Sequence, residues 1–151
     1  MSHPEVDRFV RKWNRIHRET SRLLRAAPDD RLEWQPNEGM FTLRELISHI
    51  PEAEVALTRS ALSGSTWKER LDLKGLSVAQ IADRFDQEHN NLVTEVSNLT
   101  EDQLNDEAEF HGNKTRRKVL LSAMTEHEIH HRGQVFTYLR LLGISPPNIH
   151  D

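Results

Sequence analysis

The sequence contains no cysteine, and it has only six glycines and six prolines among its 151 residues. Without cysteine the chain forms no disulfide, no cysteine-ligated zinc site and no thiol nucleophile. The low glycine and proline content excludes a collagen-like or low-complexity chain. No apolar run approaches the roughly 18 residues of a membrane-spanning helix, so no membrane partner is expected. Any chemistry must come from other side chains.

Length and charge narrow the class of protein further. The 151 residues are predicted to form a single domain, residues 1–151. Its hydrophobic core is large enough to be stable without disulfides or a structural metal. The formal net charge is -4, which gives no overall footprint for a nucleic-acid partner. The first residues lack the basic and then apolar order of a secretory signal, so a cytoplasmic location is expected.

A basic ridge runs along the N-terminal segment, although the chain as a whole is acidic. Such a ridge is usually a solvated helix face, whose charges pair with acidic residues within the fold or across a dimer. The alternatives are a nucleic-acid contact or the steering of an anionic ligand. No aromatic residues alternate with these basic residues in the way that would support a nucleic-acid contact. The ridge consists of Arg8, Arg11, Lys12, Arg15, Arg18, Arg22 and Arg25.

Apolar residues recur at steps of three and four, the period of an amphipathic helix, over four segments. They predict helices over residues 4–26, 43–63, 77–98 and 115–142, the last of them capped by Thr115. Residues 63–75 are predicted to be a linker with one helical turn, and residues 99–113 a connection with a short turn from Thr100. No segment alternates like a strand. The predicted fold class is all-α, a four-helix bundle, whose core is a common place for metal sites.

Three of the nine histidines fall where their side chains can meet. His127 and His131 are four residues apart, so their rings stand one helical turn above each other and can reach one cation. Both are predicted to face the bundle interior, on a buried stripe that also contains Leu120, Met124, Val135, Tyr138 and Leu142. His49 lies three residues after Leu46 and four before Ala53, so it is predicted to face inward as well.

Inward histidines have an ordinary explanation, because a single one is usually a core residue hydrogen-bonded to a neighbouring acceptor. Three unpaired imidazoles in one small core cost free energy unless several acceptors or one cation use their lone pairs. We therefore predict a divalent metal. Neutral imidazole favours Zn or Ni, and Fe or Mn are the alternatives.

The segment His127-Glu128-Ile129-His130-His131 also matches the H-E-x-x-H pattern of zinc peptidases, in which the glutamate activates water. The downstream histidine and glycine of the extended form are missing, and no glutamate follows Glu128. Glu128 is predicted to lie one step off the buried stripe, as a solvated carboxylate or one that supports the ligands. A metal-dependent hydrolase is therefore a less favoured alternative.

Two elements resemble the DinB/YfiT-like family over nearly the whole chain. They are His49 within Leu46-Ile47-Ser48-His49-Ile50, preceded by Trp34-Gln35-Pro36, and the run from His127 to Gln134 with Tyr138-Leu139-Arg140. The resemblance implies a four-helix bundle whose divalent metal is held by His49, His127 and His131. Members of the family are often dimers, so a homodimer is expected. Those with assigned chemistry use low-molecular-weight thiols such as bacillithiol, mycothiol or glutathione, and many others have no known activity.

Several further residues are predicted to support the ligands or to contact a substrate. Gln134 lies one turn from His131 and can orient its ring or a bound water. Arg132 can hold a carboxylate of a thiol cofactor. His89 is predicted to face inward as a hydrogen-bonded core residue, with a general base or fourth ligand as the alternative. Glu128 and His130 complete this set, and no catalytic residue is assigned.

Two classes of function fit these observations. The first is a metal-dependent transferase that uses a low-molecular-weight thiol and a small-molecule substrate. The second is a non-catalytic metal-binding bundle that has a role in protein interactions or in the response to stress. Three histidines without a close fourth ligand leave a coordination position open, which a Lewis acid needs. The sequence itself does not choose between the two.

Overall fold

Four long helices account for most of the chain in the computed structural model, which describes residues 3–150. They are α1 (Pro4–Leu24), α2 (Leu43–Ser63), α3 (Val78–Ser97) and α5 (Arg117–Leu141). Each helix lies within the bounds that the apolar period predicts, give or take two residues. The predicted all-α four-helix bundle is confirmed. Among the described residues, no helix combines the length and apolarity needed to cross a membrane.

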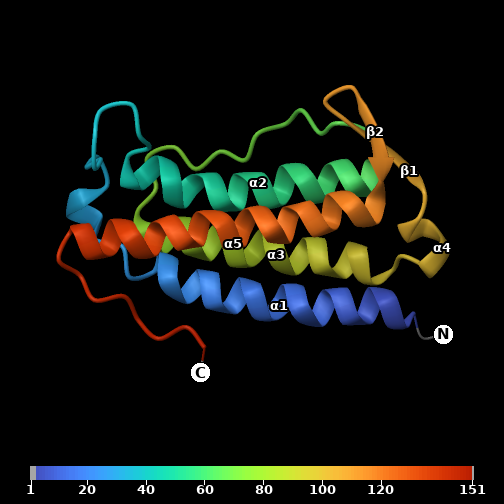
Figure 1. The fold of residues 1–151 in the computed structure, drawn as a ribbon, viewed down its shortest axis with the longest axis horizontal. Helices are drawn as coiled ribbons and strands as arrows, with labels where there is room; N and C mark the ends of the chain where they lie inside the picture. The colour runs from blue at the N-terminus through green and yellow to red at the C-terminus, as the bar shows by residue number, and fades with distance from the viewer. Residues whose placement is uncertain (1–2, 151) are drawn as a thin grey trace.

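The helices form a ring in the order α1, α3, α2, α5, in which α1 and α2 each contact both α3 and α5. Helices α2 and α3 run in the same direction, and residues 64–77 return along the length of α2 to join them (Figure 1). We call residues 64–77 the crossover segment. It is extended, with one turn at residues 74 and 75, so the helical turn predicted there is wrong.

Local signals set the ends of these helices. Thr42 and Ser77 each accept a hydrogen bond from the backbone three residues on, and Glu45 and Gln80 bond back to the cap, so both capping boxes are formed. Gly64 ends α2 in the left-handed region at φ 80°, where a residue with a Cβ is strained. The short turn predicted at Thr100 is present as α4 (Glu101–Leu104).

A small hairpin corrects the prediction that the chain has no strand. Strands β1 (Glu107–Phe110) and β2 (Asn113–Arg116) pair antiparallel through a two-residue turn at His111 and Gly112, both at positive φ. This is the geometry of a tight hairpin turn. Thr115 lies in β2 opposite Ala108, so it is not the cap of α5, which begins at Arg117. Strands of four residues are too short to show an alternating pattern.

The buried apolar side chains form two clusters, one toward each end of the bundle. Along α1, for example, Val6 and Trp13 belong to one cluster and Leu23 to the other. Buried polar residues occupy the positions between the clusters on all four long helices. This buried polar layer consists of His17, Thr20, Glu54, His89 and Glu128.

The basic ridge is partly paired within the fold. Arg25 contacts Asp83 and Asp86 of α3 at 2.8 and 2.7 Å, and Arg15 contacts Glu19 at 3.2 Å. Arg15 and Arg25 therefore behave as the ordinary interpretation of the ridge predicts, because their charges pair with acidic residues within the fold.

Candidate functional site: a histidine triad between two cavities

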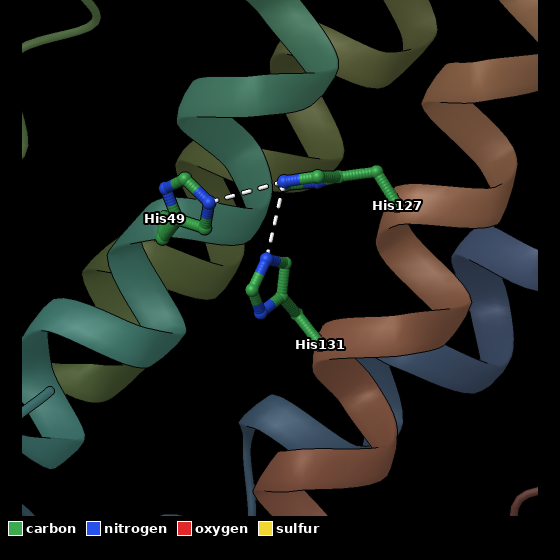
Figure 2. A group of neighbouring side chains, drawn as sticks. All are labelled: His49, His127 and His131. Carbon is green, nitrogen blue, oxygen red and sulfur yellow. Dashed lines mark hydrogen bonds between the residues drawn. The ribbon is translucent and has the colours of Figure 1, made fainter. Parts of the chain in front are cut away.

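Three imidazole rings converge where α2 and α5 pack against each other. Figure 2 shows His49 reaching from α2 toward His127 and His131 of α5. The Nε2 atom of His127 lies 3.1 Å from the Nε2 atom of His49 and 3.1 Å from that of His131. All three side chains are half-buried. The fold therefore brings together the three histidines that the sequence singled out.

The three histidines lie beside the bundle core, which corrects the prediction that they face the interior. The buried positions of α5 include Met124, Glu128 and Val135, so the buried stripe passes one residue to the side of His127. Val119, Ile129 and Leu141 of α5 are 50%, 41% and 61% exposed. The helical period alone does not separate the two faces, because a step of three from Met124 leads to His127 and a step of four leads to Glu128.

Hydrogen bonds alone do not satisfy this triad. A ring nitrogen carries either one hydrogen or one lone pair, so His127 Nε2 can complete only one of its two contacts. Burial and the neighbouring histidines lower the pKa of His127 to about 4, and burial followed by His131 lowers the pKa of His49. Both rings are therefore neutral near pH 7 and offer lone pairs.

The spacing of the donor atoms fits a metal. When imidazoles bind zinc tetrahedrally at about 2.0 to 2.1 Å, their nitrogens lie about 3.3 Å apart. The two contacts of 3.1 Å to His127 need only a small adjustment to reach that spacing. The residues present therefore fit a divalent cation.

Gln134 orients one of the three rings, as the sequence suggested. Its Oε1 atom lies 2.7 Å from His131 Nδ1 and accepts the hydrogen of that nitrogen. This bond selects the tautomer in which His131 Nε2 keeps its lone pair, which a metal ligand requires. His130 is exposed, and its ring lies edge to face with that of His131, with the centroids 4.9 Å apart; its nitrogens are not among the ligand atoms that converge in the triad.

Two cavities meet at His49 of the triad. The charged cavity, about 530 Å³, lies between the start of α2 and the crossover segment and is lined by charged side chains that include Arg44, Arg70 and Lys74. The apolar cavity, about 510 Å³, lies further along α2 under Trp67 and also borders His127. The residues that line both are His49, Glu52, Arg70 and Leu71.

Two residues beside the triad, Glu52 and Phe41, were not predicted from the sequence. Glu52 lies one turn after His49, and burial raises its pKa while Arg70 partly opposes that rise. The Phe41 ring lies 5.4 Å from the His49 ring, and its carbonyl accepts a hydrogen bond of 2.9 Å from the Tyr138 hydroxyl. The spacing to His49 could have indicated Glu52, whereas Phe41 lies in a loop without a period.

Comparison with known proteins identifies the family. The sequence model of the DinB family matches residues 1–150. The chain belongs to the DinB family. The resemblance inferred from His49 and from the run of His127 to Gln134 is thereby confirmed.

Two curated proteins are similar to this chain in sequence, and two solved structures of DinB-like proteins share its fold. The uncharacterized Bacillus subtilis (strain 168) protein YjoA is 27% identical over 129 residues, covering 82% of each chain. YrdA of the same organism is 26% identical over 96% of this chain and 87% of its own. The crystal structure of the DinB-like YjoA covers 94% of this chain and 96% of its own with a TM-score of 0.78 at 24% identity. That of a DinB-like protein from Bacillus cereus ATCC 10987 covers 93% and 94%, with a TM-score of 0.80 at 23% identity.

In this DinB-family chain Glu128 lies inside the bundle, which corrects its predicted place on a solvated face. The side chain is 2% exposed, and its Oε2 atom accepts a hydrogen bond of 2.6 Å from the Thr20 hydroxyl of α1. Burial, followed by the nearby Glu54 carboxyl, raises the pKa of Glu128 to about 8. It is therefore protonated near neutral pH and bonded away from the triad, so it does not serve as the water-activating base of a zinc peptidase.

Arg132 also lies apart from the place predicted for it. Its guanidinium donates to Glu19 of α1 at 2.9 Å, and both side chains are largely buried. The pair joins α5 to α1 on the side of the basic ridge. Arg132 is thus a contact between helices, and the cations at the triad are those of the charged cavity.

His89 belongs to the buried polar layer and does not complete the triad. Its Nδ1 lies 2.7 Å from Glu54 Oε1, which also accepts from the Trp13 indole, and its Nε2 lies 2.8 Å from Asn14 Oδ1. Burial raises the pKa of Glu54 well above its usual range and lowers that of His89 to about 4. A neutral pair, in which the Glu54 hydroxyl donates to Nδ1, accounts for both directions. The prediction of a hydrogen-bonded core histidine is confirmed.

A second group of close ligand atoms, that of His17, Glu54 and His89, does not fit a metal. The rings of His17 and His89 are stacked, with centroids 3.8 Å apart and planes only 7° apart. An imidazole binds a cation in the plane of its ring, and two stacked rings share no such plane. This group is therefore a hydrogen-bonded part of the core.

Proposed function

We propose that His49, His127 and His131 bind one divalent metal ion, Zn or Ni as first choices, and that the protein is a metal-dependent transferase acting on a low-molecular-weight thiol. The observation that supports the metal is the convergence of three Nε2 atoms, of which His127 can satisfy only one neighbour by a hydrogen bond. A cation held there supplies Lewis-acid chemistry, which lowers the pKa of a thiol or water that it binds.

The chain has no cysteine, so the sulfur nucleophile must come from a second molecule. Low-molecular-weight thiols of this kind carry carboxylates, and the charged cavity beside His49 presents Arg70 and Lys74. Neither side chain forms an ion pair or hydrogen bond with another described residue. They are therefore available to hold a carboxylate with its thiol directed toward the triad.

Glu52 is the carboxylate best placed to accept the thiol proton. It lines both cavities, and its raised pKa makes it a stronger base than an exposed glutamate. In the proposed reaction the sulfur forms a bond to an electrophilic carbon, the bond from that carbon to its leaving group breaks, and the thiol proton passes to Glu52 and then to solvent. No covalent intermediate with the protein is required.

The test compares the wild type with His131→Ala, and uses His130→Ala as the matched control on the same helix. Metal-loaded protein is incubated with bacillithiol, mycothiol or glutathione and with chlorodinitrobenzene, and formation of the thioether is followed by absorbance. We expect turnover in the wild type and in the control, and none in His131→Ala. If no thiol gives turnover above that of His131→Ala, the transferase proposal is wrong, and a non-catalytic metal-binding module takes its place.

A further inference from the structure

The apolar cavity has six apolar lining residues against three in its charged neighbour, and the charged side chains of Glu52, Lys68, Glu69 and Arg70 also border it. Three small or apolar side chains of α2 form its floor, and aromatic and aliphatic side chains of the crossover segment and β1 form the opposite side. Only Trp67 and Phe110 contribute aromatic carbocycles. The apolar lining residues are Ala53, Ala56, Leu57, Trp67, Leu71 and Phe110.

Hydrogen bonds fasten the aromatic wall to the bundle. The Trp67 backbone N–H donates to Ser60 Oγ at 2.8 Å, and that hydroxyl donates to the Ala56 carbonyl at 2.7 Å. The Arg59 guanidinium lies 6.0 Å from the centre of the Trp67 ring. These contacts attach the crossover segment at Trp67 to α2 beside the cavity.

The hairpin holds the other side of the same wall. Glu109 N–H donates to the Gly64 carbonyl at 2.9 Å, and the Thr66 hydroxyl donates to Glu109 Oε2 at 3.2 Å. The His111 N–H donates in turn to Thr66 Oγ1 at 2.8 Å. These contacts join the start of the crossover segment to β1, and residues from both, Trp67 and Phe110, line the cavity.

The two cavities share His49 and Glu52, so molecules that occupy them approach each other at the triad. A conjugation needs two substrates of different chemistry held side by side. The charged cavity suits a thiol that carries carboxylates. A volume of about 510 Å³ lies within the range of small-molecule sites, which are lined mainly by apolar and aromatic side chains.

We propose that the apolar cavity binds the electrophilic substrate through an apolar, aromatic group packed between Trp67, Phe110 and Leu57, with its reactive carbon directed toward His49. This inference rests on the proposed function for the order of the reaction, but binding of the aromatic compound requires neither metal nor thiol. The substrate class is therefore a small aromatic electrophile with a leaving group.

The test measures binding of dinitrotoluene, which has the aromatic ring of the electrophile but no leaving group, by isothermal titration calorimetry. Ala56→Trp fills the cavity from its floor, and Ala79→Trp places the same side chain on the exposed face of α3 as a matched control. We expect saturable binding to the wild type and the control, and at least a roughly tenfold weaker affinity in Ala56→Trp. Phe110→Ala, which removes an aromatic ring that lines the cavity, is expected to weaken binding as well.

The outcomes separate this inference from the proposed function. Weaker binding in Ala56→Trp and Phe110→Ala supports the apolar cavity even if no thiol is conjugated, because that result concerns binding alone. Absent binding to the wild type, or equal binding by the wild type, Ala56→Trp and Phe110→Ala, overturns the inference even if conjugation occurs. Circular dichroism of each variant excludes unfolding as the cause of a lost signal.

Discussion

At the scale of single residues, the triad depends on which ring nitrogen of each histidine carries the hydrogen. His131 donates its Nδ1 hydrogen to Gln134 Oε1 at 2.7 Å, and this bond leaves Nε2 directed at His127 as a lone pair. Gln134, one turn further along the helix, therefore accepts the ring hydrogen of His131 and fixes its tautomer. Carboxylates and backbone carbonyls have this role for many metal-bound histidines.

Replacing this acceptor should weaken the metal site without removing a ligand. We expect Gln134→Leu to lower zinc affinity by about tenfold, since supporting partners of metal ligands contribute this much or more. Competition with a chromogenic chelator measures the change. Gln134→Glu, which keeps an acceptor oxygen, should restore most of the affinity. Equal affinities for the wild type and Gln134→Leu would show that the contact with His131 has no role in binding.

Single residues also show what the sequence can and cannot predict about the site. The four-residue spacing of His127 and His131 predicts their meeting because a helix turn enforces it. Glu128 was misplaced because a step of three from Met124 leads to His127 and a step of four leads to Glu128, and both fit the helical period, although Glu128 is the buried one. Arg132 could not be predicted, since its partner Glu19 lies 113 residues away in the chain.

At the scale of elements, α1 docks on α3 through polar contacts as well as apolar ones. The His17 ring stacks on that of His89, and His17 Nε2 lies 2.7 Å from Asp86 Oδ1. Burial, followed by the neighbouring His89, lowers the pKa of His17 to about 4. The folded protein therefore holds His17 neutral at a pH where the unfolded chain protonates it.

This difference makes stability fall in mild acid. Between pH values of about 6.5 and 4 the unfolded state binds more protons than the folded state, so the free energy of unfolding decreases as pH falls. We expect His17→Gln, which can still donate to Asp86, to reduce the loss between about pH 7 and pH 5 by about 1 to 2 kcal/mol. Urea unfolding of chelator-treated protein at both pH values measures it. A loss equal to that of the wild type would mean that His17 titrates alike in both states.

Elements also mark the limit of prediction from sequence. The four long helices were predictable because each repeats its apolar period over at least 20 residues. The crossover segment and the hairpin have no such repeat, and their structure depends on contacts such as that between Thr66 and Glu109. These same elements wall the apolar cavity, so that cavity could not be read from the sequence.

At the scale of the whole molecule, the helices are held by the two apolar clusters and by the buried polar layer between them. The triad lies beside this core and contributes none of its buried apolar area. Metal binding is therefore expected to add stability to an already folded bundle through linkage, unlike the folding of a zinc finger around its metal.

Removing the metal should consequently leave the fold intact. We expect chelation to keep the far-ultraviolet circular dichroism of the helices, and to lower the melting temperature only by the linkage contribution. His127→Ala should resemble the chelated wild type in both measurements. Loss of helical signal on chelation would show that the metal, and not the two clusters, holds the bundle together.

The central claim is that His49, His127 and His131 form one metal site, and the metal content of the purified protein tests it most directly. Elemental analysis of the wild type should give about one divalent metal per chain, as expected for a mononuclear site of three histidines. His130→Ala, an exposed neighbour on the same helix, should give the same value, and His127→Ala should give nearly none. Equal metal content in all three proteins would contradict the account.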